Sequence, residues 1–189
     1  MNLANKITLS RIALIPLFMI TYMWDFAYNE LVACIIFAIA ALTDGVDGYV
    51  ARNYKMVTDF GKFIDPLADK LLVATALICF VGEGEIAAYM AVIIIAREFI
   101  VTGLRTVAMS KGVVIAASMT GKIKTCIQIG AVICVFLFGY NSSYGESFIF
   151  EFFGKEYSIG YIAMFIATIF TIYSGIEYLA VNKSLLEDH

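Results

Sequence analysis

The sequence predicts an all-α, polytopic membrane protein with six transmembrane helices and both termini in the cytoplasm. The first observation is composition, since 61% of the 189 residues are hydrophobic and 15% are charged. Soluble domains are roughly half apolar and a quarter charged. At ~20 residues per span, the chain has room for about six helices and no sizeable second domain. We therefore expect one integral membrane domain over residues 1–189.

Each predicted span is built around an uncharged run, which is the second observation. In chain order the runs cover 12–24, 31–43, 71–82, 86–96, 125–145 and 157–176. Extending them to spanning length predicts helices over 8–25, 30–52, 61–82, 86–109, 119–140 and 157–180. The first run could belong to a signal peptide, but no small-residue cleavage site follows it, so we expect a retained helix. The loop over 140–157, with its aromatic and acidic residues, is expected on the outer surface.

The first four spans differ from the last two. Only the last two are apolar over 18 residues or more, and the others reach spanning length by including charged residues. A charge at the middle of a membrane costs roughly 2.5–3.5 kcal/mol on insertion scales. We therefore expect the charges of the first four spans to face the bundle interior or a wet cavity.

The distribution of Lys and Arg is the third observation. With the N-terminus in the cytoplasm, the basic residues on that side are Lys6, Arg11, Arg52, Lys55, Lys62, Lys111, Lys122, Lys124 and Lys183. The opposite side has Lys155 beside seven acids, Asp25, Glu30, Glu83, Glu85, Glu146, Glu151 and Glu156. The positive-inside rule then predicts a multi-pass protein of the cell membrane with cytoplasmic termini. The net charge of −3 offers no basic surface for nucleic acid.

Aspartates and small residues recur at helical spacing in the second and third spans. They form two stripes, Asp44, Asp47, Gly48, Ala51 and Arg52 on one span, and Gly61, Asp65 and Asp69 on the next. The two helices are antiparallel and joined by a short loop, so position 44 is level with 69, and 47 is level with 65. Four carboxylates are therefore expected to meet near the cytoplasmic end of the bundle.

Four neighbouring carboxylates cannot all ionise without cations, because like charges raise one another's pKa. Oxygen ligands without His or Cys favour one or two hard ions such as Mg²⁺, Mn²⁺ or Ca²⁺ over zinc. Gly48, Ala51 and Gly61 lie one turn from the acids and leave room for a ligand against the backbone. Metal-binding acids beside small residues fit chemistry on a diphosphate.

Two other interpretations remain open. Acids inside a membrane can satisfy hydrogen bonds between helices, and paired acids also line the ion paths of cation transporters. A transporter predicts acids near the midplane that are accessible from both sides. Here the acids lie toward one end, which favours an enzyme whose active site opens to the cytoplasm.

The pattern Asp-x2-Asp-Gly-x2-Ala-Arg-x8-Gly-x3-Asp-x3-Asp resembles the signature of the CDP-alcohol phosphotransferase family at all eight fixed positions. The resemblance implies that an alcohol displaces CMP from a CDP-linked lipid, commonly in a homodimer with two divalent metals, here Mg²⁺ or Mn²⁺. It also implies that Asp44, Asp47 and Asp65 bind metal. Asp69 then completes the metal site, acts as the general base, or does both.

Two further stretches resemble bacterial phosphatidylglycerophosphate synthases. They are Asn5-Lys-Ile-Thr8-Leu-Ser-Arg11, followed by Pro16, and Ala96-Arg97-Glu98-Phe-Ile-Val-Thr-Gly103-Leu-Arg105, followed by Gly121-Lys122-Ile-Lys124-Thr125. The resemblance implies CDP-diacylglycerol as the lipid donor and sn-glycerol 3-phosphate as the acceptor. Inositol phosphate, serine or phosphatidylglycerol are the alternative acceptors within the same family.

The remaining site residues follow from these stretches. The residues expected to bind the CDP-lipid are Asn5, Thr8, Gly48, Ala51, Arg52 and Gly61. Those expected to bind the acceptor phosphate are Arg11, Arg105, Lys122 and Lys124, since cations near the acids can form a phosphate pocket. The alternatives are that both lysines only follow the positive-inside rule, that Arg97 forms a structural ion pair with Glu98, and that Glu98 orients Arg105.

Overall fold

A computed structural model gives the fold of the chain. It describes residues 3–53, 59–110, 112, 113, 115, 118–142, 149–152 and 154–183. The side chains that it describes are those of residues 10–43, 68, 70–109, 112, 113, 115, 118–142, 149–151 and 154–183.

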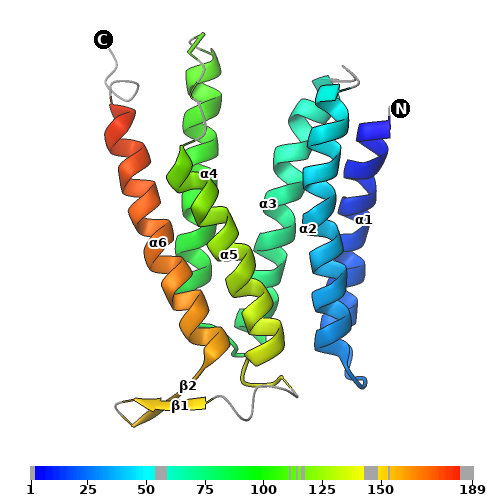
Figure 1. Cartoon of the computed structure of the whole chain (residues 1–189), viewed down its shortest axis with the longest axis vertical. Helices are drawn as coiled ribbons and strands as arrows, with labels where there is room; N and C mark the ends of the chain where they lie inside the picture. The colour runs from blue at the N-terminus through cyan, green and yellow to red at the C-terminus, as the bar shows by residue number, and fades with distance from the viewer. Residues whose placement is uncertain are drawn as a thin grey trace.

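Six long helices make up most of the described chain. They are α1 (Leu3–Met23), α2 (Asn29–Asn53), α3 (Asp59–Gly82), α4 (Ala88–Ser110), α5 (Met119–Phe138) and α6 (Ile159–Val181). Each predicted span coincides with one helix, and the ends differ by up to five residues. The helices alternate in direction, so both termini lie at the same end of the bundle (Figure 1). We call this the terminus end; it holds the starts of α1, α3 and α5 and the ends of α2, α4 and α6.

The apolar character of the helices follows the sequence pattern. Within the described residues, α5 and α6 are long and apolar enough to cross a membrane. Shorter apolar stretches cover Ser10–Met23, Asn29–Thr43 and Lys70–Gly82. The structure therefore supports a helical membrane protein, whereas six complete crossings remain a prediction.

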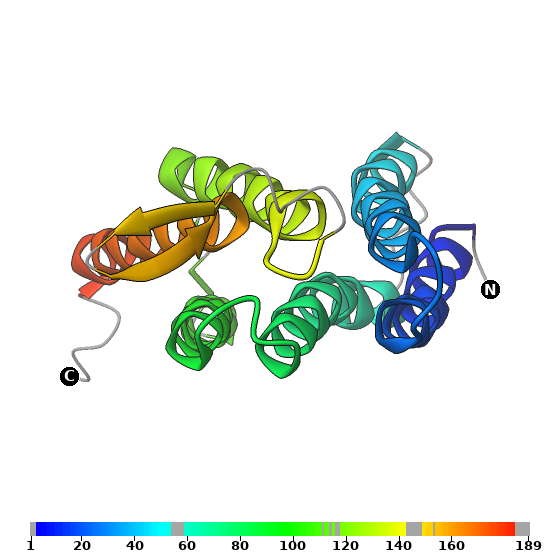
Figure 2. The ribbon, with the colours of Figure 1, turned by 90° about the horizontal axis from the view of Figure 1, so that it is seen from below.

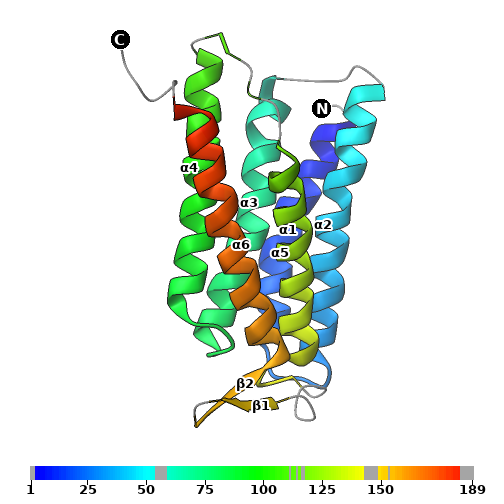
Figure 3. The ribbon, with the colours of Figure 1, turned by 60° about the vertical axis from the view of Figure 1, so that its left-hand side comes forward.

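An aromatic cluster joins four helices in the half of the bundle away from the termini. Phe18 of α1, Phe37 of α2 and Phe80 of α3 surround Phe136 of α5, with ring centroids 5.8, 5.9 and 4.8 Å from that of Phe136. All four rings are fully or almost fully buried. Such pairs contribute about 0.5–1.5 kcal/mol each beyond the burial of their area. The aromatic part of the core therefore lies in the half away from the termini, and Figures 1 and 3 show α2 and α5 diverging toward the terminus end.

The backbones of α5 and α6 approach closely where α6 begins. A Cβ atom on Gly160 would lie 2.7 Å from the Val135 Cα atom, which is closer than real side chains allow. Ser158 caps α6 by accepting a hydrogen bond from the Tyr161 N–H at 3.0 Å, and Ser118 caps α5 in the same way. Glycine at position 160 therefore sets the distance between the two helices.

A short antiparallel hairpin lies within the segment over 140–157 that the sequence analysis expects to be a loop. Strands β1 (Ile149–Phe152) and β2 (Lys155–Ser158) pair with Phe150 opposite Tyr157 and Glu151 opposite Glu156. Gly154, with φ of 69°, lies in the turn between them. Figure 2, viewed from this side, shows the hairpin lying over the start of α6. Strands of four residues are too short to give a clear alternating pattern, so the segment was expected to be a loop.

Glu85, in the connection between α3 and α4, holds the segment that follows α5. Its two carboxylate oxygens accept hydrogen bonds from the N–H groups of Tyr140 and Asn141, at 2.6 and 2.7 Å. Burial raises the pKa of Glu85, although the two backbone hydrogen bonds partly oppose this shift. We call this end of the bundle the hairpin end.

Candidate functional site

The four aspartates lie on α2 and α3 at matching depths. Asp47 lies six residues before the end of α2, and Asp65 lies six residues after the start of α3. Asp44 and Asp69 lie nine and ten residues from the same ends. At 1.5 Å per residue, these depths are about 9 Å and about 14–15 Å from the terminus end. The two helices contact each other, so the backbone agrees with the predicted pairing of levels.

The side chains of these aspartates lie outside the described residues, and so do those of the expected CDP-lipid site. For that site the structure gives helical backbone only, at Asn5, Thr8, Gly48, Ala51, Arg52 and Gly61. Among the side chains that are described, no group of three or more His, Cys, Asp or Glu residues could hold a metal. The metal and CDP-lipid assignments therefore remain predictions.

The cations expected to bind the acceptor phosphate differ in their surroundings. Arg11 of α1 is fully buried, and Lys124 of α5 is 3% exposed. Lys122, two residues before Lys124, lies on the opposite side of α5 and is exposed. Arg105, in the second half of α4, is partly buried. The four residues therefore do not present one uniform cationic surface.

A polar network joins α4, α5 and α6. The Glu98 Oε1 atom accepts a hydrogen bond from the Arg97 Nη1 atom at 3.0 Å and another from the Lys124 Nζ atom. The Arg97 Nη2 atom donates to the Ser174 hydroxyl on α6 at 2.8 Å. The Arg97–Glu98 ion pair that the sequence left open is therefore present. Lys124 has a carboxylate partner within the protein, which the sequence analysis did not assign.

The polar network lies between Gly175 of α6 on one side and a narrow space next to α3 on the other. A Cβ atom on Gly175 would lie 3.2 Å from the Arg97 Cγ atom, so glycine leaves room for the Arg97 side chain beside α6. On the other side, Glu98 lines a small space between α3 and α4 together with Lys70. Lys70 follows Asp69 directly in the chain. The network therefore lies close to the part of α3 that carries the aspartates.

Arg105 has a different partner from the one that the sequence suggested. The Arg105 Nε atom donates to the Tyr178 hydroxyl at 3.2 Å, and the guanidinium carbon lies 5.6 Å from the centroid of the Tyr178 ring. The described contacts of Glu98 are with Arg97 and Lys124, so the alternative in which Glu98 orients Arg105 finds no contact among the described residues. Sequence reasoning missed Ser174 and Tyr178. Their spacing of one helical turn within an apolar span was the signal that could have found them.

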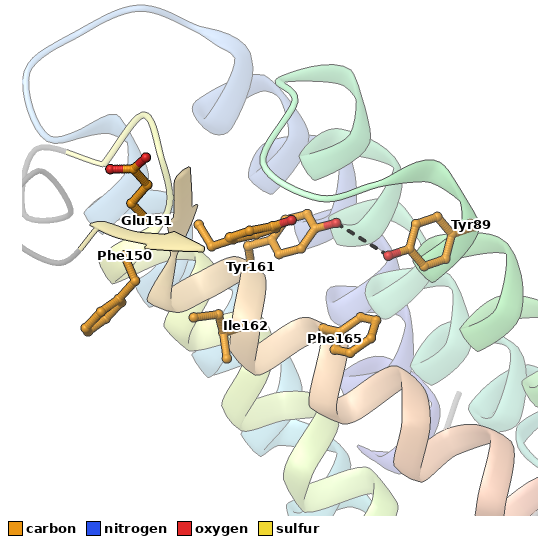
Figure 4. Close-up of a pocket in the computed structure, with 7 residues that line it drawn as sticks. Tyr89, Phe150, Glu151, Tyr161, Ile162 and Phe165 are labelled. Atoms are coloured by element: carbon orange, nitrogen blue, oxygen red, sulfur yellow. Dashed lines mark hydrogen bonds between the residues drawn. The ribbon is translucent and has the colours of Figure 1, made fainter. Parts of the chain in front are cut away.

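The larger described pockets lie at the hairpin end. One, of about 520 Å³, is lined mainly by aromatic rings, and within it the hydroxyls of Tyr89 and Tyr161 lie 3.4 Å apart (Figure 4). A second, of about 350 Å³, is lined largely by acids and amides, including Asp25, Glu30 and Glu83. Neither contains a predicted site residue. The candidate site is therefore defined by the charges at the terminus end and not by the volume of a described pocket.

Comparison with known proteins adds an independent line of evidence. Residues 1–173 match the family model described as CDP-alcohol phosphatidyltransferase. The chain is 45% identical to the "CDP-diacylglycerol--glycerol-3-phosphate 3-phosphatidyltransferase" of Bacillus subtilis (strain 168), with 98% of this chain and 97% of that protein aligned. It is 35% identical to the protein of the same name from Rickettsia bellii, with 96% of each covered. It is 36% identical to a "Probable phosphatidylglycerophosphate synthase" of Mycobacterium tuberculosis, over 95% of this chain and 80% of that protein.

Proposed function

Since the chain belongs to the CDP-alcohol phosphatidyltransferase family, we infer that it is a CDP-diacylglycerol–glycerol-3-phosphate 3-phosphatidyltransferase. It transfers the phosphatidyl group of CDP-diacylglycerol to sn-glycerol 3-phosphate and releases CMP. The observation that carries this conclusion is identity of 33–45% over almost the whole chain to relatives with that printed name. The family match also leaves the alternative of a cation transporter without support.

The enzyme is a helical membrane protein, and we propose that it forms one domain over residues 1–189 with six spans and cytoplasmic termini. The alternation of the six helices and the concentration of Lys and Arg at the terminus end support this orientation. The active site then faces the cytoplasm, where the nucleotide and the acceptor are dissolved. The lipid tails enter laterally between helices. The homodimer that the family resemblance implies belongs to the same proposal.

The donor set of the chain fits a divalent metal. Asp44, Asp47, Asp65 and Asp69 supply oxygen ligands from two contacting helices, which suits Mg²⁺ or Mn²⁺ and leaves no sulfur or imidazole ligand for zinc. We propose that these four residues hold two such ions. When bound, the ions would neutralise the diphosphate of the CDP-lipid. Gly48, Ala51 and Gly61, one turn away on the same helices, leave the backbone open to that group, and Asn5, Thr8 and Arg52 complete the proposed CDP-lipid site.

The proposed reaction needs a general base and residues that bind the acceptor. The primary hydroxyl oxygen of sn-glycerol 3-phosphate attacks the phosphorus on the lipid side of the diphosphate. The bond from that phosphorus to the CMP oxygen breaks, and Asp69 takes the hydroxyl proton. The acceptor phosphate is proposed to lie against cations of the terminus half, Arg11, Arg105, Lys122 and Lys124. Charge-assisted hydrogen bonds from arginine suit phosphate particularly well.

Release of CMP by the purified protein in detergent micelles tests the function. With CDP-diacylglycerol, Mn²⁺ or Mg²⁺ and sn-glycerol 3-phosphate, we expect CMP and phosphatidylglycerol phosphate in equal amounts, and loss of both when a chelator removes the metal. Parallel assays replace sn-glycerol 3-phosphate with one of the alternative acceptors, which are inositol phosphate, serine and phosphatidylglycerol. CMP release with one of these and not with sn-glycerol 3-phosphate contradicts the acceptor assignment. Metal flux into sealed vesicles without CDP-lipid, together with no CMP release, contradicts the enzymatic function.

A further inference from the structure

We propose that Tyr178 is a positioning residue that orients Arg105 toward the phosphate of the acceptor, an inference that rests on the proposed function. Tyr178 belongs to α6 and Arg105 to α4, and the two residues are 73 positions apart in the chain. Both lie in the terminus half of the bundle, in which the aspartates also lie.

The contact with Tyr178 uses only the inner nitrogen of Arg105. The Nε atom donates to the Tyr178 hydroxyl at 3.2 Å, and the ring lies within range of a cation–π contact. Because the guanidinium group is planar, fixing Nε also fixes the direction in which both terminal nitrogens point. No contact of these terminal nitrogens is found among the residues that the structure describes. They form the pair of donors that binds a phosphate with two parallel hydrogen bonds.

Arg97 provides the contrast within the same helix. Its two terminal nitrogens are both used inside the protein, one by the Glu98 carboxylate and the other by the Ser174 hydroxyl. Lys124, almost completely buried, also donates to Glu98. These contacts connect α4 with α5 and α6, and they engage both terminal nitrogens of Arg97. Arg105 is the arginine of α4 whose outer edge is left for a ligand in the described structure.

Tyr178 is itself held firmly. Its side chain is 4% exposed and packs in a small core cluster with Val101 and Leu104 of α4. Its backbone carbonyl accepts two hydrogen bonds from Asn182 at the end of α6, from the backbone N–H at 3.2 Å and from the Nδ2 atom at 2.8 Å. A phenol fixed at both its ring and its backbone is a rigid acceptor. The geometry of Arg105 is therefore set before the acceptor binds, which lowers the entropy lost on binding.

Steady-state kinetics of a Tyr178→Phe variant tests this role. The substitution keeps the ring and its packing and removes the hydroxyl that accepts from Arg105. We expect KM for sn-glycerol 3-phosphate to rise about tenfold, which is typical of a lost contact to a charged group. We expect kcat, KM for CDP-diacylglycerol and Tm to stay unchanged. Tyr173→Phe makes the same chemical change at an exposed position of α6 and should alter none of these quantities.

A second arm separates positioning from a purely structural role. In an Arg105→Lys background no Nε atom remains, so Tyr178→Phe should add no further rise in KM. An unchanged acceptor KM in Tyr178→Phe overturns the inference, and so does an equal loss for both substrates together with a lower Tm. If the wild-type protein is active, these results reject the role of Tyr178 alone. If the wild-type protein releases no CMP with sn-glycerol 3-phosphate, the proposed function fails and this inference fails with it.

Discussion

Replacement of Glu98 by glutamine should destabilise the protein, because Glu98 is the shared partner of two cations on two helices. Its Oε1 atom accepts from Arg97 Nη1 at 3.0 Å and from Lys124 Nζ. The Lys124 side chain is 4% exposed and that of Glu98 is 21% exposed. Removing one member of a buried ion pair costs about 3–5 kcal/mol, since the other charge stays buried. The partial exposure of Glu98 places the expected loss at the lower end, about 3 kcal/mol.

The free energy of unfolding in detergent micelles, followed by helical circular dichroism, measures this loss. A Glu98→Gln, Lys124→Met double variant should recover most of it, because an apolar pair commonly replaces a buried ion pair without loss. Glu83→Gln, at an exposed position outside the network, should change the unfolding free energy by less than about 0.5 kcal/mol. If the double variant loses the sum of the two single losses, the ion pair is not the source of the stability and the reasoning is refuted.

Three further substitutions test other parts of the structure. Gly160→Ala should lower the unfolding free energy by about 1–3 kcal/mol, because the alanine methyl group would overlap Val135. Gly130→Ala is the control, because a methyl group there meets no atom within 4 Å and should not lower the unfolding free energy. Equal losses of unfolding free energy in the two variants would contradict the role of the close approach of α5 and α6. Burial raises the pKa of Glu85 above its usual 4.5, so the native state binds more protons than the unfolded state between the two pKa values. Stability should therefore decrease as the pH rises from about 4.5 through the raised pKa, and Tm against pH should lose this slope in Glu85→Gln. Asp69→Asn should abolish CMP release while CDP-lipid binding, measured at equilibrium, persists; loss of binding together with turnover would argue against Asp69 as the base.

The sequence was sufficient for the helices because their signal is local. Each uncharged run is long enough to mark its own helix, and the depth of Asp44, Asp47, Asp65 and Asp69 follows from the ends of two consecutive helices. The hairpin was missed because its strands have four residues each. The resemblance at fixed spacing led to the correct family for the same reason, since all eight signature residues lie within one continuous segment.

The contacts of the site required the fold. Ser174 lies 77 residues from Arg97, and no pattern in the sequence brings them together. The pairing of Lys124 with Glu98 likewise depends on how α4 and α5 pack, whereas Arg97 and Glu98 are neighbours in the chain. The charge pattern of the sequence predicted which charged residues lie inside the bundle. It did not predict which of them form ion pairs with one another. That distinction separates Arg97 and Lys124, which pair with the Glu98 carboxylate, from Arg105.

The aromatic cluster around Phe136 joins α1, α2, α3 and α5 near one end of each helix. The helices that it joins are fixed to one another near the hairpin end, and α5, with 20 residues, is about 30 Å long. A tilt of about 5° at the fastened end shifts the far end of such a helix by about 3 Å. This is roughly the length of one hydrogen bond. Small tilts of α2 and α5 would therefore change the distance between them at the terminus end while the aromatic contacts around Phe136 stay in place.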